Sequence, residues 1–319
     1  MITQLSLLLA LFSGAIDANH EEVHFTNAGI TFGGTVVIPQ GQVKAGMVCI
    51  HGSGASTRYD FLRWSNDLAA KGIATFCYDK RGCGESGGDW RFSTLQDLAG
   101  DADAALASLA KRVSGAPLGL FSASQGPWVA SIVSGRNKSV KFMVNISGGP
   151  VNVGDQEAAR RTLDAKNLGA PAGVAKKIIT TYFTYLTSNG TQQRSELDAL
   201  CRQYNQANWY KALSMADNPA LPGEWPPLRK AFASDLGQNF TEKYAQLKIP
   251  VLALLGQNDQ VMPPTLLEQK YRDTFSGERA KLLTLKVIPG ANHQLSLGGG
   301  ALAPGVLESI ADWVLHHAR

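Results

Sequence analysis

The stretch Leu118-Gly119-Leu120-Phe121-Ser122-Ala123-Ser124-Gln125-Gly126-Pro127-Trp128-Val129-Ala130 joins a strand-like apolar run directly to a helix-compatible run. A strand, a sharp turn and a helix in this order are typical of a nucleophile elbow, which lifts a serine hydroxyl above a sheet. Ser124 lies at the turn. Small residues are needed two positions before and after it, and Ser122 replaces the usual glycine at the first while Gly126 keeps the second. The alternative is a chance S-x-S-x-G in a loop, but the flanking runs favour a serine nucleophile that forms an acyl-enzyme.

The composition is that of an ordinary globular protein. The chain has 319 residues, 44% of them hydrophobic and 18% charged, which is enough for one large core or a core with a modest second unit. Thirty Lys and Arg against 26 Asp and Glu leave a net charge of +4. No long run of like charges occurs, so we expect no nucleic-acid partner and instead a small-molecule or peptide substrate.

Residues 1–18 resemble a secretory signal peptide. The apolar run Leu5–Phe12 is followed by Ser13-Gly14-Ala15, a small-x-small cleavage candidate. The usual positive charge is missing, because no Lys or Arg occurs before Lys44. The run is also shorter than the about 20 residues that span a bilayer, so no stable membrane anchor is expected. We predict a secreted or periplasmic protein; the alternative is a cytoplasmic one with a packed N-terminal segment.

The four cysteines do not have the spacing of a disulfide framework or a metal site. Cys49 and Cys77 lie inside apolar strand-like runs, where a free thiol behaves as a small buried hydrophobe. If the chain is exported, a disulfide between Cys83 and Cys201 is an alternative that the sequence leaves undecided.

Short β-rich runs alternate with longer amphipathic runs, which predicts an α/β fold with a mainly parallel sheet flanked by helices. The first two strands, separated by Asn27-Ala28-Gly29, have the pattern of a hairpin. Ser93 and Gln96 are spaced as the capping box of a helix over 94–109. The strands are expected at 22–26, 35–38, 47–50, 73–78, 118–121, 142–146, 250–255 and 282–288, and the other helices at 61–70, 127–133, 265–274 and 306–316.

This alternation stops at Ser147-Gly148-Gly149-Pro150. From Val151 to about Lys248 the chain has helical periodicity and many aromatic residues. We predict a helical cap over 151–248, inserted in an α/β core made of 19–150 and 249–319. The aromatic residues suggest an apolar pocket for an acyl or aryl group, although helical packing alone explains most of them.

Histidine is scarce enough to search for a catalytic base by elimination. His293 directly follows the last expected strand, and parallel sheets place active sites at the carboxyl ends of their strands. The other candidates lie near the N-terminus, at the end of the last helix, where a cation favours the helix dipole, or in a loop after the third strand. These five are His20, His24, His316, His317 and His51.

A carboxylate should orient the imidazole and stabilise its cationic form. Asp259 follows the preceding strand and therefore lies at the same edge of the sheet as His293. The alternative is that Asp259 has only a structural role, as an Asx-turn residue that shapes the loop. Asp155, after the strand that precedes the cap, is the weaker rival. The order Ser124, Asp259, His293 is the nucleophile, acid, base order of α/β-hydrolases.

An oxyanion hole needs two backbone donors aimed at the developing negative oxygen. The amide of Gln125, next to the nucleophile, is the first candidate. The amide of Ser53, in Ile50-His51-Gly52-Ser53-Gly54 after the third strand, is the second, because the glycines permit a close approach. His51 is then expected to brace this loop rather than to transfer protons.

The sequence contains one motif that resembles a nucleotide-binding turn and no metal-binding pattern. Gly82-Cys83-Gly84-Glu85-Ser86-Gly87 matches the G-x-G-x-x-G of dinucleotide-binding turns, but that motif opens a helix, and here Gly88-Asp89-Trp90 follow instead. No H-E-x-x-H or Cys/His cluster occurs. We therefore expect no nucleotide cofactor and no metal.

Taken together, these motifs resemble the α/β-hydrolase superfamily, and within it the bacterial serine esterases related to the serine aminopeptidase group. The resemblance implies hydrolysis of carboxylic esters. An aminopeptidase or amidase with the same triad is the first alternative, and a non-catalytic binding protein on a hydrolase scaffold is the second. The motifs are His51-Gly52-Ser53-Gly54, Tyr78-Asp79-Lys80-Arg81-Gly82-Cys83-Gly84-Glu85-Ser86, Ser122-Ala123-Ser124-Gln125-Gly126, Gly256-Gln257-Asn258-Asp259 and Gly290-Ala291-Asn292-His293.

Overall fold

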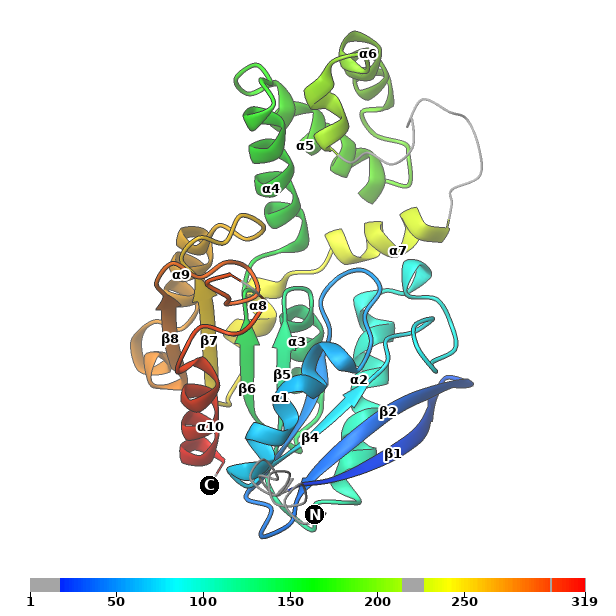
Figure 1. Ribbon diagram of the computed structural model, residues 1–319. Helices are drawn as coiled ribbons and strands as arrows, with labels where there is room; N and C mark the ends of the chain where they lie inside the picture. The colour runs from blue at the N-terminus through cyan, green and yellow to red at the C-terminus, as the bar shows by residue number, and fades with distance from the viewer. Residues whose placement is uncertain (1–17, 214–226, 299, 319) are drawn as a thin grey trace, which may run out of the picture.

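A computed structural model describes residues 18–213, 227–298 and 300–318 (Figure 1). The expected signal peptide lies outside the described residues except for Ala18. The described strands form one sheet in the order β1-β2-β4-β3-β5-β6-β7-β8, parallel from β4 to β8 and antiparallel at β1 and β2. This confirms the expected α/β fold. The strands are β1 (Ala18–Asn27), β2 (Ile30–Pro39), β3 (Ala45–Ile50), β4 (Ile73–Tyr78), β5 (Leu118–Ala123), β6 (Val140–Ile146), β7 (Val251–Gly256) and β8 (Leu283–Ile288).

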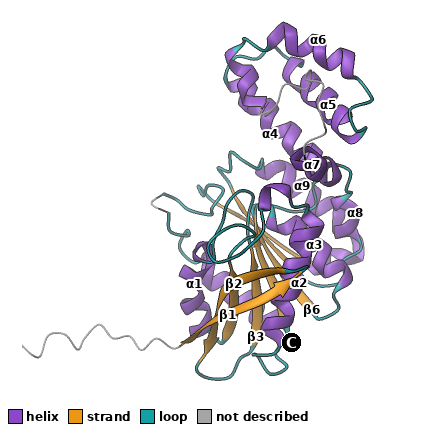
Figure 2. Ribbon diagram, turned by 90° about the vertical axis from the view of Figure 1, so that its right-hand side faces the viewer, coloured by secondary structure: helices purple, strands orange, loops and turns teal. Residues whose placement is uncertain are grey.

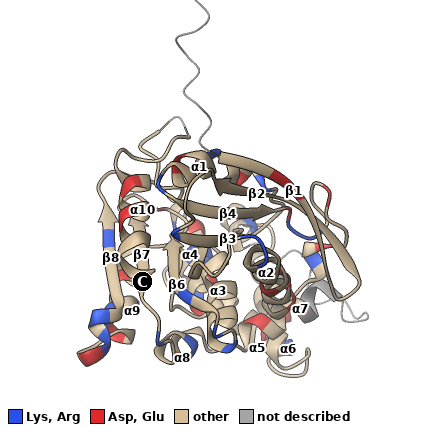
Figure 3. Ribbon diagram, turned by 90° about the horizontal axis from the view of Figure 1, so that it is seen from below, with Lys and Arg blue, Asp and Glu red and all other residues tan. Residues whose placement is uncertain are grey.

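Helices cover both faces of the sheet (Figure 3). One face packs against α1 (Tyr59–Ala70) and α10 (Val306–His317). The other packs against α2 (Leu95–Ala110), α3 (Gly126–Arg136), α8 (Phe240–Ala245) and α9 (Pro264–Thr274). Because neither face meets water, every residue of β3, β4 and β7 is buried, and these strands are continuously apolar rather than alternating.

The helices between β6 and β7 form a separate layer above the carboxyl ends of the strands (Figures 1 and 2). The layer contains α4 (Val153–Asn167), α5 (Val174–Thr187), α6 (Arg194–Tyr204) and α7 (Pro227–Leu236), but not α8, which also precedes β7. We call α4 to α7 the inserted helices. Ile178, Trp209 and Leu186 belong to apolar clusters inside this layer. By contrast, α8 buries its aromatic side chains in the core of the sheet, so the layer ends before the Lys248 boundary that the sequence suggested.

One local expectation needs correction, and one alternative that the sequence left open is decided. The capping box of α2 is formed by Thr94 and Asp97, one residue later than expected: the Asp97 amide donates to Thr94 Oγ1 at 3.1 Å, and the Thr94 amide to Asp97 Oδ2 at 2.8 Å. Asp serves here because its carboxylate also reaches the N-cap amide. In addition, all four cysteines are free, so Cys83 and Cys201 do not pair. No helix in the described ranges is long and apolar enough to cross a membrane.

Candidate active site

The turn between β5 and α3 has the backbone of a nucleophile elbow. Ser124 has φ +58°, a left-handed conformation that L-residues rarely adopt. Its amide donates to Ile146 O of the neighbouring strand at 2.9 Å, which holds the turn against the sheet. A Cβ at Gly126 would lie 2.5 Å from Ile50 O, so only glycine fits there. Strain of this kind persists where the surrounding structure enforces it and is common at functional sites.

Ser122, where glycine is usual, is fully buried, and its hydroxyl has a hydrogen-bond partner. Its hydroxyl donates to Asn145 Oδ1 at 2.8 Å, on the adjacent strand β6. The Asn145 amide in turn donates to the hydroxyls of Tyr244 and Tyr271 at 3.0 and 2.9 Å. The departure from glycine is therefore compensated by a hydrogen-bond network that ties the elbow to α8 and α9.

Ser124, His293 and Asp259 meet at the carboxyl ends of β5, β8 and β7. His293 Nε2 lies 3.0 Å from Ser124 Oγ, and His293 Nδ1 lies 2.7 Å from Asp259 Oδ2. An ionised carboxylate only accepts hydrogen bonds, so it selects the tautomer with the proton on Nδ1 and leaves Nε2 free to accept from the serine. Asp155, the rival acid, is exposed in the first turn of α4.

Contacts between loops fix the position of His293. The Asn292 side chain accepts from the amides of Gln294 and Ser296, both at 3.0 Å, and closes the turn that carries the histidine. This turn crosses the end of β7 closely: a Cβ on Gly256 would lie 2.1 Å from Asn292 O. The glycine at the end of β7 is therefore a packing requirement of the histidine loop.

The loop after β3 approaches the serine from the other side. A Cβ on Gly52 would lie 3.2 Å from Ser124 Cβ. The amides of Ser53 and Gln125, the expected oxyanion donors, have no hydrogen-bond acceptor among the described residues. Lys80, which sequence reasoning did not single out, holds this loop. Its Nζ donates to Gly52 O at 2.7 Å, Gly54 O at 3.1 Å and Gln125 Oε1 at 3.1 Å.

His51 lies under the loop and makes no hydrogen bond to Ser124 among the described contacts. Its Nε2 donates to Tyr78 O, while its buried Nδ1 has no partner among the described residues. Burial lowers the pKa of His51, because it disfavours the charged form of the ring. It links the end of β3 to the end of β4.

The glycine-rich loop 82–87 wraps around a carboxylate of the protein itself. Asp79 accepts from the Glu85 amide at 2.9 Å and from the Arg58 amide and guanidinium at 2.8 and 2.7 Å. A Cβ on Gly84, which has φ +51°, would lie 2.3 Å from the Asp79 carboxylate. The glycines thus serve this internal contact, and the helix that a dinucleotide turn requires does not follow.

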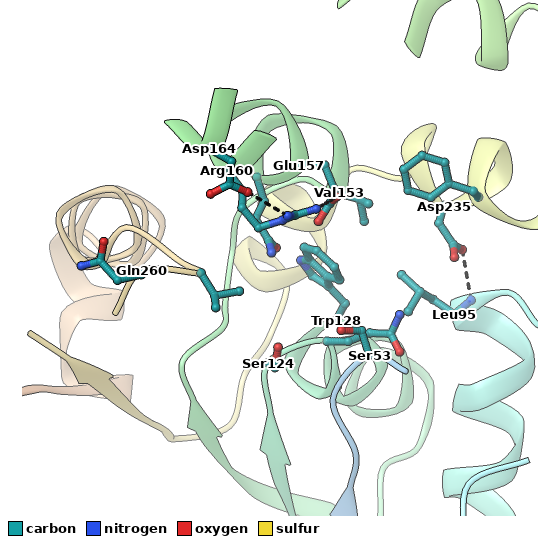
Figure 4. A pocket seen from close by; sticks show the side chains of 14 residues that line it. Ser53, Leu95, Ser124, Trp128, Val153, Glu157, Arg160, Asp164, Asp235 and Gln260 are labelled. Carbon is teal, nitrogen blue, oxygen red and sulfur yellow. Dashed lines mark hydrogen bonds and ion pairs between the residues drawn. The ribbon is translucent and has the colours of Figure 1, made fainter. Parts of the chain in front are cut away.

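Two cavities meet at the serine. The cap-side cavity, of about 620 Å³, lies between the elbow, α4 and α7 (Figure 4). The α1-side cavity, of about 400 Å³, is lined by Phe61 and Trp64 of α1 and by His293. Ser53, Ser124 and Val261 line both. Ser124 therefore borders open space on two sides.

The cap-side cavity combines an apolar floor with a charged wall. Its apolar residues are Leu95, Trp128, Val153, Phe232 and Val261. On α4, Arg160 pairs with Glu157 at 2.9 Å and with Asp164 at 3.2 Å (Figure 4). The i, i+3 and i+7 spacing of these three charges is the signal in the sequence that would have placed them on one helix face. Most aromatic residues of the inserted helices instead pack among themselves.

Asp235 of α7 joins the inserted helices to the sheet layer. Its Oδ1 accepts from the Leu95 amide at 3.0 Å, at the start of α2. Burial raises the pKa of Asp235 to about 7. No group of three or more His, Cys, Asp or Glu side chains that could hold a metal ion occurs in the described ranges.

The chain is similar to known hydrolases in sequence and in structure. The model of the family described as serine aminopeptidase, S33, matches residues 41–297. An esterase from Pyrococcus furiosus has a similar structure (TM-score 0.62, 15% identity, covering 100% of this chain and 96% of that one). The structure is also similar to that of a dienelactone hydrolase from Anabaena variabilis (TM-score 0.54, 17% identity, covering 95% of this chain and 100% of that one). A proline iminopeptidase from Mycobacterium smegmatis is similar as well (TM-score 0.58, 12% identity, covering 93% of this chain and 99% of that one). A search of curated protein sequences found no match.

Proposed function

Because the chain belongs to the serine aminopeptidase (S33) family of α/β hydrolases, we propose that it is a serine hydrolase that cleaves carboxylic esters through an acyl-enzyme on Ser124. One observation carries the proposal: Ser124 Oγ, 3.0 Å from His293 Nε2, sits at a strained elbow beside two amides that have no acceptor among the described residues. A nucleophile, a base and oxyanion donors are the parts that acyl transfer requires.

The mechanism follows from these positions. His293 Nε2 takes the Ser124 hydroxyl proton while Oγ attacks the ester carbonyl carbon, and the amides of Ser53 and Gln125 donate to the oxygen that becomes negative. Asp259 stabilises the imidazolium that forms. When the tetrahedral intermediate collapses, the imidazolium returns the proton to the leaving alkoxide. Water repeats the sequence, releases the acid and restores the serine.

The two cavities have different roles in this mechanism. His293 lines the α1-side cavity, and the leaving group must receive its proton from His293. The alcohol portion is therefore assigned to the α1-side cavity, against Phe61 and Trp64. The acyl portion is assigned to the cap-side cavity, whose apolar floor suits a hydrocarbon chain.

Cleavage of aminoacyl amides is the second candidate. The name of the matching family and the structural likeness to a proline iminopeptidase favour it. The same triad serves both reactions, so the leaving group and the inserted helices decide between them.

The test compares nitrophenyl esters of increasing acyl length with aminoacyl nitroanilides, using the wild-type protein and Ser124→Ala. We expect the wild type to hydrolyse the esters with burst kinetics and to be labelled by a fluorophosphonate, and Ser124→Ala to lose both. Turnover of nitroanilides in preference to esters would favour the amidase. Full labelling of Ser124→Ala would refute the nucleophile, and an inactive, unlabelled wild type would point to a binding protein.

A further inference from the structure

Lys80 is a buried cation whose contacts are neutral oxygens. Only 5% of the residue is exposed, and among the described residues its ammonium group forms no ion pair with a carboxylate. Its three hydrogen bonds go instead to Gly52 O, Gly54 O and Gln125 Oε1, and its Nζ lies 5.6 Å from the centre of the Trp90 ring. Burying an ammonium group without a counter-ion is costly, so its position calls for an explanation beyond stability.

We propose that Lys80 is a positioning residue for the oxyanion hole, whose ammonium group holds the Ser53 and Gln125 segments in the geometry that receives the developing negative charge. This inference rests on the function proposed above. Lys80 does not itself touch the reacting atoms in this scheme; it acts through the two residues that supply the donors.

The peptide group between Gly52 and Ser53 shows how this works. Gly52 O and the Ser53 amide belong to one planar peptide unit and point in opposite directions. A hydrogen bond of 2.7 Å from Lys80 to Gly52 O therefore also fixes the direction of the Ser53 N–H. A cation on the carbonyl further polarises the unit, which strengthens the N–H as a donor.

The Gln125 side of the oxyanion hole also contacts the Lys80 ammonium group. Gln125 follows the nucleophile, and its side chain accepts from Lys80 at 3.1 Å. The elbow and the loop after β3 come from segments more than seventy residues apart in the chain. A single ammonium group with three hydrogens joins them. A neutral amine has two hydrogens for the same three acceptors and lacks the charge.

Burial lowers the pKa of Lys80 to about 8, while the nearby Cys83 acts in the opposite direction. Lys80 also lines a small void with four titratable or charged residues, His51, Tyr78, Arg81 and Asp101, and it directly follows Asp79, whose carboxylate contacts Arg58 and Glu85. The ammonium form is lost as the pH rises through this pKa, so hydrolysis should decline on the alkaline side.

The experiment uses the full chain with Lys80→Met, Lys80→Arg and the exposed control Lys138→Met, checked by circular dichroism. With a nitrophenyl ester we expect Lys80→Met to lower kcat about 10- to 100-fold and to change KM less than about threefold, because oxyanion contacts act mainly in the transition state. A trifluoromethyl ketone, which forms a hemiketal oxyanion on the serine, should bind more weakly by a similar factor. Lys138→Met should match the wild type.

The pH profile gives a second readout that does not depend on the folding of Lys80→Met. We expect the wild-type kcat to fall as the pH rises, with an apparent pKa near 8. In Lys80→Arg, whose guanidinium stays charged, this alkaline decline should move to higher pH. A wild-type kcat in folded Lys80→Met, ketone affinity unchanged by that substitution, or an alkaline limb unchanged in Lys80→Arg would overturn the role of Lys80. Failure of the proposed function is distinct, because the wild type itself would then neither hydrolyse esters nor react with a fluorophosphonate.

Discussion

At the scale of single residues, Asp259 uses its two carboxylate oxygens for different tasks. Oδ1 accepts from the amides of Val261 and Met262, both at 2.8 Å, and shapes the turn after β7. Oδ2 lies 2.7 Å from His293 Nδ1. The two sequence interpretations of this residue, a turn former and the partner of the base, are therefore compatible in the structure.

These two tasks can be separated by Asp259→Asn. The asparagine keeps an oxygen for the turn amides but presents an NH2 group to His293, which favours the wrong tautomer of the ring. We expect kcat for ester hydrolysis to fall about 10³- to 10⁴-fold with little change in the thermal unfolding midpoint. A large loss of stability with proportionate loss of activity would show that the turn is the main role.

A second prediction concerns the strained backbone of Ser124. Ser124→Ala keeps a Cβ at φ +58°, whereas Ser124→Gly removes it. Both variants should be inactive, but Ser124→Gly should have a free energy of unfolding about 1 kcal/mol higher than Ser124→Ala. Urea denaturation measures the difference. Equal stabilities would mean that the elbow stores no strain at this residue.

How far the sequence predicts the site depends on the kind of contact. Ser124, Asp259 and His293 could be proposed because each follows a strand, and parallel strands end at one edge of the sheet. Lys80 could not, since its role depends on the three-dimensional position of its Nζ relative to three carbonyl oxygens. The catalytic roles of these residues, and of the Ser53 and Gln125 amides, stay predictions until they are tested.

At the scale of elements, close crossings of loops and strand ends position the histidine. Gly256 ends β7 directly beneath Asn292 of the loop that carries His293. A strand that ended in any residue with a Cβ would push this loop away from the elbow. Strands β3, β4 and β7 were predictable, because apolar runs are typical of strands that are covered on both faces, whereas β1 and β2 are longer than the runs expected at 22–26 and 35–38.

We expect Gly256→Ala to cost about 3 kcal/mol of unfolding free energy and to lower kcat at least about tenfold, since small displacements of a catalytic group are expensive. Gly135→Ala is the matched control. It lies near the end of α3 with open space around its position, so it should raise stability by about 0.5 kcal/mol and leave activity unchanged. Similar behaviour of the two variants would contradict the packing argument.

At the scale of the whole molecule, the inserted helices are attached to the sheet layer through α7. Asp235 accepts from the Leu95 amide at 3.0 Å, and Gln96 donates to Gln238 at 3.2 Å. The sequence indicated an insertion over 151–248 but could not separate α8 from the inserted helices. The periodicity of a helix does not reveal which layer its apolar face contacts.

Asp235 makes the attachment sensitive to pH. Burial raises its pKa in the folded protein to about 7 from 3.8, so its contribution to stability is fully present below about pH 4 and is lost as the pH rises through 7. Across this window the wild type should lose as much as about 4 kcal/mol of unfolding free energy relative to Asp235→Asn. Urea denaturation at pH 4, 5.5 and 8 measures this; parallel curves for the two proteins would exclude the effect.

The two cavities at Ser124 share Ser53, Ser124 and Val261 but differ in the helices that line them. Helices α4 and α7 contribute only to the cap-side cavity, whereas α1 contributes only to the α1-side cavity. Substitutions in α4 and α7 can therefore reshape the cap-side cavity and leave the α1 wall of the other cavity unchanged. Under the function proposed above, different helices would then select the acid and the alcohol of the substrate, so that changes in the preferred acid need not alter the preferred alcohol.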